Sequence, residues 1–118
     1  MLLEMKTRLS EPDILVIELA GRITLGREST HIQDTVVKAV NDGVRKIVMD
    51  IANVHHIDSA GLGILVFSAG TLSKQGGKFL LAGANGHALE VLQMTHLDSV
   101  IPFSPSAELA CATMAGEG

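Results

Sequence analysis

The feature that most constrains the fold is a regular alternation of strand-like and helix-like segments along the 118 residues. Residues 47–51 (Ile-Val-Met-Asp-Ile) are apolar on both faces, as a central strand of a parallel sheet should be. Residues 13–20 form a second apolar run, bounded by Pro12 and Gly21, and predict another buried strand. Helical spacing between such strands predicts a mostly parallel sheet with helices packed on it.

Local signals place the ends of several elements. The sequence from Thr30 to Gln33 has the form of a capping box and predicts a helix start at Thr30. Pro102 restricts the last strand to a sheet edge, and Ser104 followed by Pro105 predicts the N-cap and first position of the last helix. In chain order we expect an antiparallel edge strand 1–9, a turn 10–13, strand 13–20, helix 30–43, strand 47–51, helix 60–75, strand 79–82, helix 84–96, strand 100–103 and helix 105–114, with residues 116–118 frayed.

Composition excludes several classes of function. Nine Lys and Arg against 13 Asp and Glu give a net charge of −4, and the chain has three Phe but no Trp or Tyr. Neither the charge nor the aromatic content suits nucleic-acid binding. Residues 1–9 contain too much charge for a signal peptide, and the longest apolar-rich run, 60–72, is shorter than the roughly 20 residues that span a bilayer. With Cys111 as the lone cysteine, we expect a soluble cytoplasmic protein without membrane insertion.

The most informative segment is the transition from strand to helix at residues 50–63. We expect a buried strand to end, a polar turn to follow, and a helix to open with Asp58 and Ser59. Either residue can cap that helix, and Asp58 is also a favourable charge at its N-terminus. Gly61 and Gly63 each cost about 1 kcal/mol relative to alanine in a helix. Glycine is understandable there if another backbone or a partner approaches closely, so the segment predicts an accessible serine.

Residues 58–63 (Asp-Ser-Ala-Gly-Leu-Gly) resemble the signature of anti-sigma factor antagonists, whose usual form is Asp-Ser-Ser-Gly-Leu-Gly. The order of elements is similar to the STAS fold over essentially the whole chain. Gly21 with Ile23 resembles the family's Gly-x-Leu-Asp, and residues 76–77 resemble the Gly-Gly pair before its fourth strand. The resemblance implies a single STAS domain over residues 1–118. Its α/β fold is expected to have a mostly parallel mixed sheet of about five strands and about four packed helices.

The resemblance also implies a partner-switching cycle without enzymatic activity, catalytic residues or a cofactor. In the family, the unphosphorylated antagonist binds an anti-sigma factor, which releases a sigma factor for transcription. The anti-sigma factor is itself a serine kinase that phosphorylates the antagonist, and a phosphatase reverses this step. The matching serine here is Ser59. The partner-binding residues that the resemblance implies are Arg22, Ile23, Thr24, Asp58, Ser59, Ala60, Gly61, Leu62 and Gly63.

Three positions depart from the family pattern. Ala60 replaces the second serine, which leaves Ser59 as the only phosphate acceptor in the motif. Thr24 stands where the family usually has Asp, and Arg22 stands where an acidic residue is common. Because that loop helps to form the family's partner surface, the identity of the partner stays open.

Other interpretations of the same residues remain. One interpretation of Ser59 is an ordinary helix N-cap. A separate alternative is a STAS scaffold that no kinase phosphorylates, for example a subunit of a signalling assembly or of a membrane lipid-transport complex. The strand-to-helix turn is similar to that of an α/β-hydrolase nucleophile, but the first glycine of Gly-x-Ser-x-Gly is missing. His55 and His56 with Asp58 suggest metal ligands, but adjacent residues of an extended segment point opposite ways. We therefore expect no enzyme and no metal site.

Overall fold

The computed structural model describes residues 3–116. In chain order the elements are β1 (Leu3–Ser10), β2 (Ile14–Ile23), α1 (Arg27–Asn41), β3 (Lys46–Ile57), α2 (Ser59–Lys74), β4 (Lys78–Ala82), α3 (Gly86–Met94), a short 3-10 turn η1 (Leu97–Ser99), β5 (Phe103–Ser104) and α4 (Ala107–Ala115). The described strands form one sheet in the order β1-β2-β3-β4-β5. β1 runs antiparallel to β2 and the other neighbours are parallel, which confirms the predicted α/β fold.

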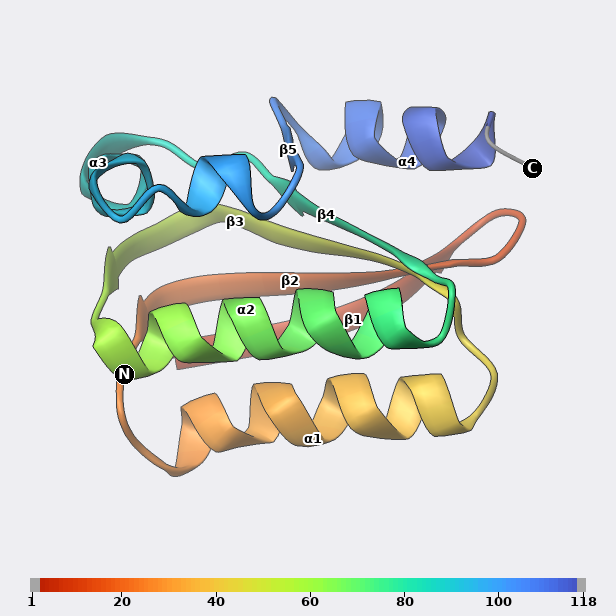
Figure 1. Ribbon diagram of the computed structural model, residues 1–118, viewed down its shortest axis with the longest axis horizontal. Helices are drawn as coiled ribbons and strands as arrows, with labels where there is room; N and C mark the ends of the chain where they lie inside the picture. Colours follow the sequence, from red (N-terminus) through yellow and green to blue (C-terminus); the bar gives the residue numbers. More distant parts are fainter. Residues whose placement is uncertain (1–2, 117–118) are drawn as a thin grey trace.

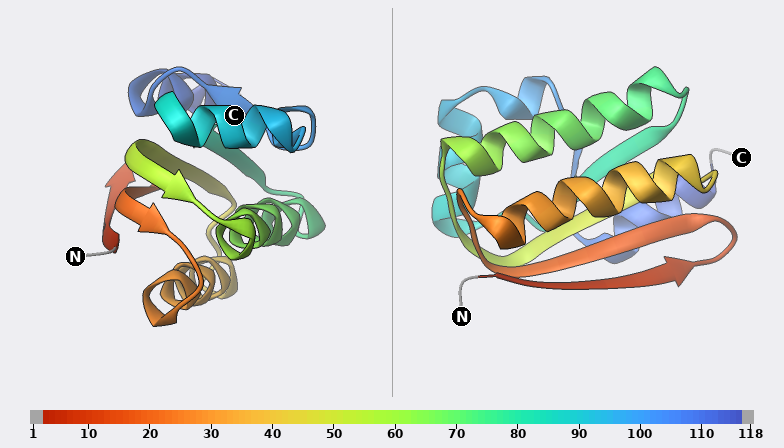
Figure 2. Two further views of the ribbon diagram at one scale, coloured as in Figure 1. Left: turned by 90° about the vertical axis from the view of Figure 1, so that its left-hand side faces the viewer. Right: turned by 90° about the horizontal axis from the view of Figure 1, so that it is seen from below.

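The helices cover both faces of the sheet. Figure 1 shows α1 and α2 together on one side and α3 and α4 on the other, and Figure 2 shows the same layers from the end. The side chains of β3 alternate between the two layers. Ile47, Met49 and Ile51 are buried in the large core under α1 and α2, while Val48 is buried in a smaller cluster with Ala110 of α4. β2 and β3 are therefore interior strands, as their apolar sequences predict.

The first helix begins earlier than the sequence predicts. α1 starts at Arg27, and Gly26 is its N-cap residue without any side-chain hydrogen bond. Thr30 already lies in the first turn, where its hydroxyl donates to the Gly26 carbonyl oxygen at 3.1 Å. The predicted capping box at Thr30 is therefore wrong, because Gly26 makes the turn into the helix with a positive φ of 155°.

The third strand is longer than predicted. β3 continues to Ile57, so the residues expected to form a polar turn after position 51 are part of the sheet. β2 also extends, to Ile23, and two register shifts keep it paired with β3 up to Ile57. The buried Val54 and Ile57 maintain contact with the core through this polar stretch.

The C-terminal elements also differ in their bounds. β5 contains only Phe103 and Ser104, although Pro102 still accepts a hydrogen bond from Leu81 N at 3.0 Å at the sheet edge. The N-cap of α4 is Ser106, whose hydroxyl accepts from Leu109 N at 3.1 Å, so the predicted cap at Ser104 is wrong. The helices α2 and α3 fall within one or two residues of prediction. The predicted strand start at residues 1–2 and the predicted fraying at 117–118 lie outside the described residues.

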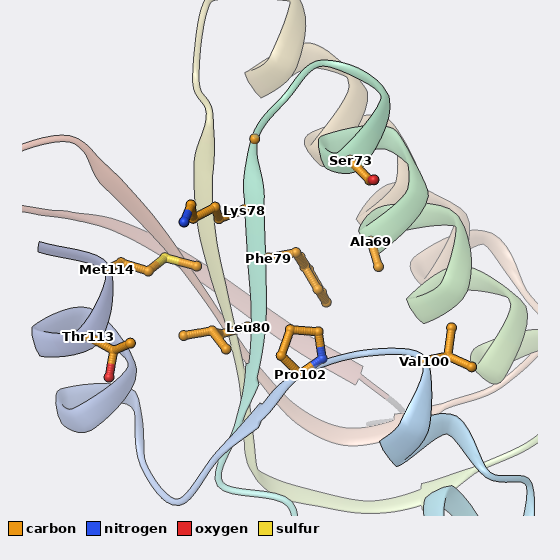
Figure 3. Close-up of a pocket in the computed structure, with 10 residues that line it drawn as sticks. Ala69, Ser73, Lys78, Phe79, Leu80, Val100, Pro102, Thr113 and Met114 are labelled. Carbon is orange, nitrogen blue, oxygen red and sulfur yellow. The ribbon is translucent and has the colours of Figure 1, made fainter. Parts of the chain in front are cut away.

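The short β5 leaves the first half of β4 at the edge of the sheet. A pocket of about 380 Å³ opens there between α2, β4 and α4. Figure 3 shows Phe79 pointing towards α2 and Leu80 pointing towards α4 from the half of the strand that does not pair with β5. The pocket borders Ala69 and Ser73, so it lies along the C-terminal half of α2, away from the segment with Asp58 and Ser59.

Candidate functional site

Asp58 joins the N-terminus of α2 to the loop after β2. Its Oδ1 accepts a hydrogen bond from Gly61 N at 2.9 Å, and its Oδ2 accepts from Leu25 N at 3.1 Å. Its own N–H donates to the Ile23 carbonyl oxygen at 3.2 Å. The Gly61 N–H, and less strongly those of Leu25 and Ala60, hold the pKa of the Asp58 carboxyl below its usual value, against the opposing effect of burial. Asp58 is thus the N-cap of α2 and fixes one loop beside it.

We expect Asp58→Ala to lower the free energy of unfolding by about 2 kcal/mol at neutral pH, because a cap is lost and two N–H groups lose their acceptor. A carboxyl whose folded pKa is depressed stabilises the fold above its unfolded pKa, and that stability disappears as pH falls through the lower folded pKa. The usual value for Asp58 is 3.8. Urea denaturation should therefore show that the difference in free energy of unfolding between wild type and Asp58→Ala shrinks below about pH 4.

Asp58→Asn is the matched control, because asparagine caps a helix well but does not ionise. The difference between Asp58→Asn and Asp58→Ala should stay constant across this pH range, whereas the difference between wild type and Asp58→Asn should shrink in acid. A wild-type advantage that is the same at pH 7 and at about pH 3 would contradict the role of the ionised carboxylate.

Ser59 occupies the first helical position of α2, directly after the cap. Its side chain is exposed to solvent. Since Asp58 provides the capping oxygen, the interpretation of Ser59 as the N-cap is wrong. The Ser59 hydroxyl is therefore placed at the protein surface beside the positive end of the helix dipole.

The two glycines of the motif lie in different environments. A Cβ on Gly61 would overlap the Ile23 carbonyl oxygen and lie 2.9 Å from Ile57 Cγ2, so Gly61 is required by the protein's own backbone. A Cβ on Gly63 would meet nothing within 4 Å. Ile23 is itself fully buried. Ile23 and Gly61, which the resemblance includes among the partner-binding residues, are therefore both buried.

The other residues of the predicted set lie at or near the surface. Arg22, Ser59 and Gly63 are exposed, while Thr24, Asp58, Ala60 and Leu62 are half-buried. The structure thus gathers the end of β2, the following loop and the first turn of α2 into one region, which the hydrogen bond between Asp58 and Leu25 holds together.

Sequence reasoning missed the apolar side chains that surround this region. Leu25 is 84% exposed, Val66 44% and Phe67 40%. Val66 lies outside the core face of α2, which is formed by Ile64, Leu65 and other buried residues. The signal for these exposed side chains is the apolar character of the whole circumference of α2, which carries Lys74 as its one charge. The sequence contains no comparable signal for Leu25.

The histidines do not form a metal site with Asp58. His56 stacks on His87 of α3, with ring centroids 5.8 Å apart and an angle of 8° between the planes. His55, its neighbour in β3, is exposed. Between residues 3 and 116, His, Cys, Asp and Glu side chains form no group of three or more that is able to hold a metal ion.

Comparison with known proteins identifies the family. The sequence model described as the STAS domain matches residues 7–110. The chain belongs to the STAS family. A Thermotoga maritima protein that is named as an anti-sigma factor antagonist is 36% identical over 88 residues, which cover 73% of this chain and 78% of that protein.

Solved structures share the STAS fold. A crystal structure of an anti-sigma factor antagonist from Mycobacterium paratuberculosis superposes with a TM-score of 0.79 at 22% identity, over 94% of this chain and 92% of that one. The Bacillus protein SpoIIAA in its phosphorylated form gives a TM-score of 0.74 at 18% identity, over 94% and 99% of the two chains. The predicted STAS fold is confirmed. In this STAS domain, none of the helices found between residues 3 and 116 has the length and apolarity needed to cross a membrane.

Proposed function

We propose that this STAS domain, residues 1–118 acting as one unit in the cytoplasm, is an anti-sigma factor antagonist controlled by phosphorylation of Ser59. Unphosphorylated, it binds an anti-sigma factor with serine kinase activity and so releases a sigma factor. Phosphorylation by that kinase ends the binding, and a phosphatase restores it. The domain acts through binding and not through catalysis.

One observation carries the proposal: Ser59 is exposed at the start of α2 while Asp58 takes over the capping role. A phosphate can therefore be added without removing a hydrogen bond on which α2 depends. The positive end of the helix dipole favours an anion at this position. The similarity to relatives named anti-sigma factor antagonists, and to a structure solved in a phosphorylated form, supports the same function.

Three of the other serines suit a kinase less well than Ser59. Ser29 and Ser68 are buried, and the Ser68 hydroxyl donates to the Ile64 carbonyl oxygen at 2.8 Å. Ser73 is exposed but lies inside the last turns of α2, where the backbone is fixed in a helix. Unlike these three, Ser59 combines exposure with a position at the start of a helix, directly after the preceding strand.

We expect incubation with ATP and a kinase-type anti-sigma factor of the same organism to add one phosphate, on Ser59. Intact-mass measurement counts the phosphates. Ser59, Ser68 and Ser73 share the tryptic peptide 47–74, so fragment spectra are needed to place the group. Ser59→Ala should accept none, and Ser73→Ala, as the matched control, should accept one. Phosphate that persists on Ser59→Ala would reject the site, and no phosphate with any candidate kinase would favour an unswitched STAS scaffold.

A further inference from the structure

The outer side of β1 is a long strand edge that the domain leaves open. β1 stands first in the sheet order and pairs with β2 on its inner side. All eight of its residues pair with β2 without a register shift, so the strand has no bulge. In the right-hand view of Figure 2, β1 forms the rim of the molecule. Such an edge presents N–H and C=O groups to a further strand, and proteins usually shorten, cover or bulge their edges to prevent this.

Three charged side chains alternate along β1 on the face of the sheet away from α1. Glu4, Lys6 and Arg8 are all exposed. Arg8 is already paired, because its Nε lies 3.2 Å from Oε2 of Glu18 in β2. Glu4 and Lys6 form no ion pair or side-chain hydrogen bond with any other residue between 3 and 116. A lysine on an open edge normally discourages pairing, but the unpaired carboxylate two residues earlier is its complement.

These charges select one register for pairing with a second copy of β1. An antiparallel pair of identical strands is two-fold symmetric, so one residue faces itself and its neighbours face each other in reverse order. We consider the registers that pair at least five described residues of each strand. A centre at Lys6 or Arg8 places like charges directly opposite, and a centre at Thr7 places Lys6 against Arg8. A centre at Met5 instead places Glu4 against Lys6 twice.

The apolar face of β1 suits the same register. Leu3 is buried and Met5 is partly exposed. Together with Glu28 and His31 of α1 they line a hollow of about 190 Å³ beside the strand. With the centre at Met5, the two Met5 side chains lie opposite each other on this face, with Cβ atoms about 4.5–5.5 Å apart. Methionine is flexible and fills irregular gaps, so each Met5 covers apolar surface that a single copy leaves in water.

We propose that two copies of this STAS domain pair through residues 3–7 of β1. The strands run antiparallel with Met5 on the two-fold axis, and Glu4 of each copy lies against Lys6 of the other. The sheet then continues from one copy into the next, with α1 of both copies on the same side. Five residues from each copy are few beside the roughly 20–30 of a standard interface, so the dimer forms weakly and reversibly. The inference goes beyond the proposed function, since Ser59 lies on α2 and not at this edge.

Sedimentation velocity of the full chain over a concentration series tests the charge pairing. Glu4→Lys and Lys6→Glu each place like charges opposite one another twice, so each should raise the dimer dissociation constant about tenfold or more. The double variant Glu4→Lys/Lys6→Glu exchanges the signs and should dimerise like the wild type. Lys74→Glu is the matched control, because it changes the net charge as Lys6→Glu does but lies at the end of α2. It should also dimerise like the wild type, and thermal melts should show all variants folded.

Cysteine cross-linking identifies the register and captures a weak dimer. Met5→Cys, in a chain that also carries Cys111→Ser, places two thiols opposite each other at the axis. Residues directly opposite in an antiparallel pair have the Cα separation that a disulfide needs, roughly 4.4–6.8 Å. Thr7→Cys in the same background is the matched control, because Thr7 faces Leu3 in this register. We expect mild oxidation to give a covalent dimer of Met5→Cys and little of Thr7→Cys.

Four outcomes would overturn the proposal. The wild type stays monomeric at every concentration, or a single charge reversal dimerises as well as the wild type. The double variant is folded but stays dissociated, or the cysteines at positions 5 and 7 cross-link equally. Phosphorylation of Ser59 is measured separately, so the failure of this dimer and the failure of the proposed function are distinguishable.

Discussion

Phosphorylation of Ser59 should weaken the complex with the anti-sigma factor by roughly a hundredfold to a few thousandfold, without unfolding the STAS domain. Phosphate adds about −1.5 to −2 charges and three acceptor oxygens. In the free domain this charge lies in water at a helix N-terminus, where it is tolerated. A docked partner would remove that water beside the carboxylate of Asp58. An unpaired buried charge costs about 3–5 kcal/mol, and each 1.4 kcal/mol corresponds to a factor of ten in affinity.

Two substitutions separate charge from loss of the hydroxyl. Ser59→Asp should show part of the loss, because a carboxylate has less charge and fewer acceptor oxygens than a phosphate. Ser59→Ala should bind nearly as tightly as the unphosphorylated wild type and should not respond to kinase and ATP. Calorimetric titration measures all of these affinities, and thermal melts check the fold. Equal affinity for wild type and Ser59→Asp, with both folded, would exclude electrostatic blocking as the mechanism.

The interior strands could be predicted from sequence because a strand that is buried on both faces is a nearly continuous run of apolar residues. Residues 14–20 and 47–51 are apolar with little interruption, and both lie in interior strands, although the predicted strand start at Asp13 is one residue too early. The extension of β3 to Ile57 could not be predicted in this way. It depends on register shifts that keep β2 paired beyond Glu18, and the polar side chains of that stretch resemble a turn when the partner strand is unknown.

The cap of α2 shows why the site was predicted only in outline. Asp and Ser are both good N-cap residues, so the motif alone does not decide between them. The tertiary structure selects Asp58 as the cap, because the loop at Leu25 supplies a second N–H to the Asp58 carboxylate. The exposed side chain of Leu25 escaped prediction for a similar reason: one leucine in a loop has no periodicity that distinguishes a buried side chain from an exposed one.

The glycines of the motif give the sharpest contrast between two positions that look alike in sequence. We expect Gly61→Ala to lower the free energy of unfolding by at least about 2 kcal/mol. Overpacking of a closely packed site costs about that much, and the added methyl group would meet the backbone carbonyl of Ile23, which moves less easily than a side chain. For a domain of this size, the midpoint of thermal unfolding should fall by roughly 8 °C. Gly63→Ala should instead raise the free energy of unfolding by up to about 1 kcal/mol, because alanine favours a helix and nothing opposes its Cβ.

The Gly61→Ala substitution should also affect the phosphorylation of Ser59, in addition to lowering the free energy of unfolding. The methyl group would push the Ile23 carbonyl away from α2, and Ile23 leads directly into the loop whose Leu25 N–H binds Asp58. The arrangement that presents Ser59 should therefore loosen, and phosphorylation should slow even in the fraction that remains folded. Gly63→Ala serves as the matched control, with the same chemical change two residues away and a phosphorylation rate like that of the wild type. If the two variants are equally stable in urea and are phosphorylated at equal rates, close packing of the Ile23 backbone on Gly61 is not what positions the serine.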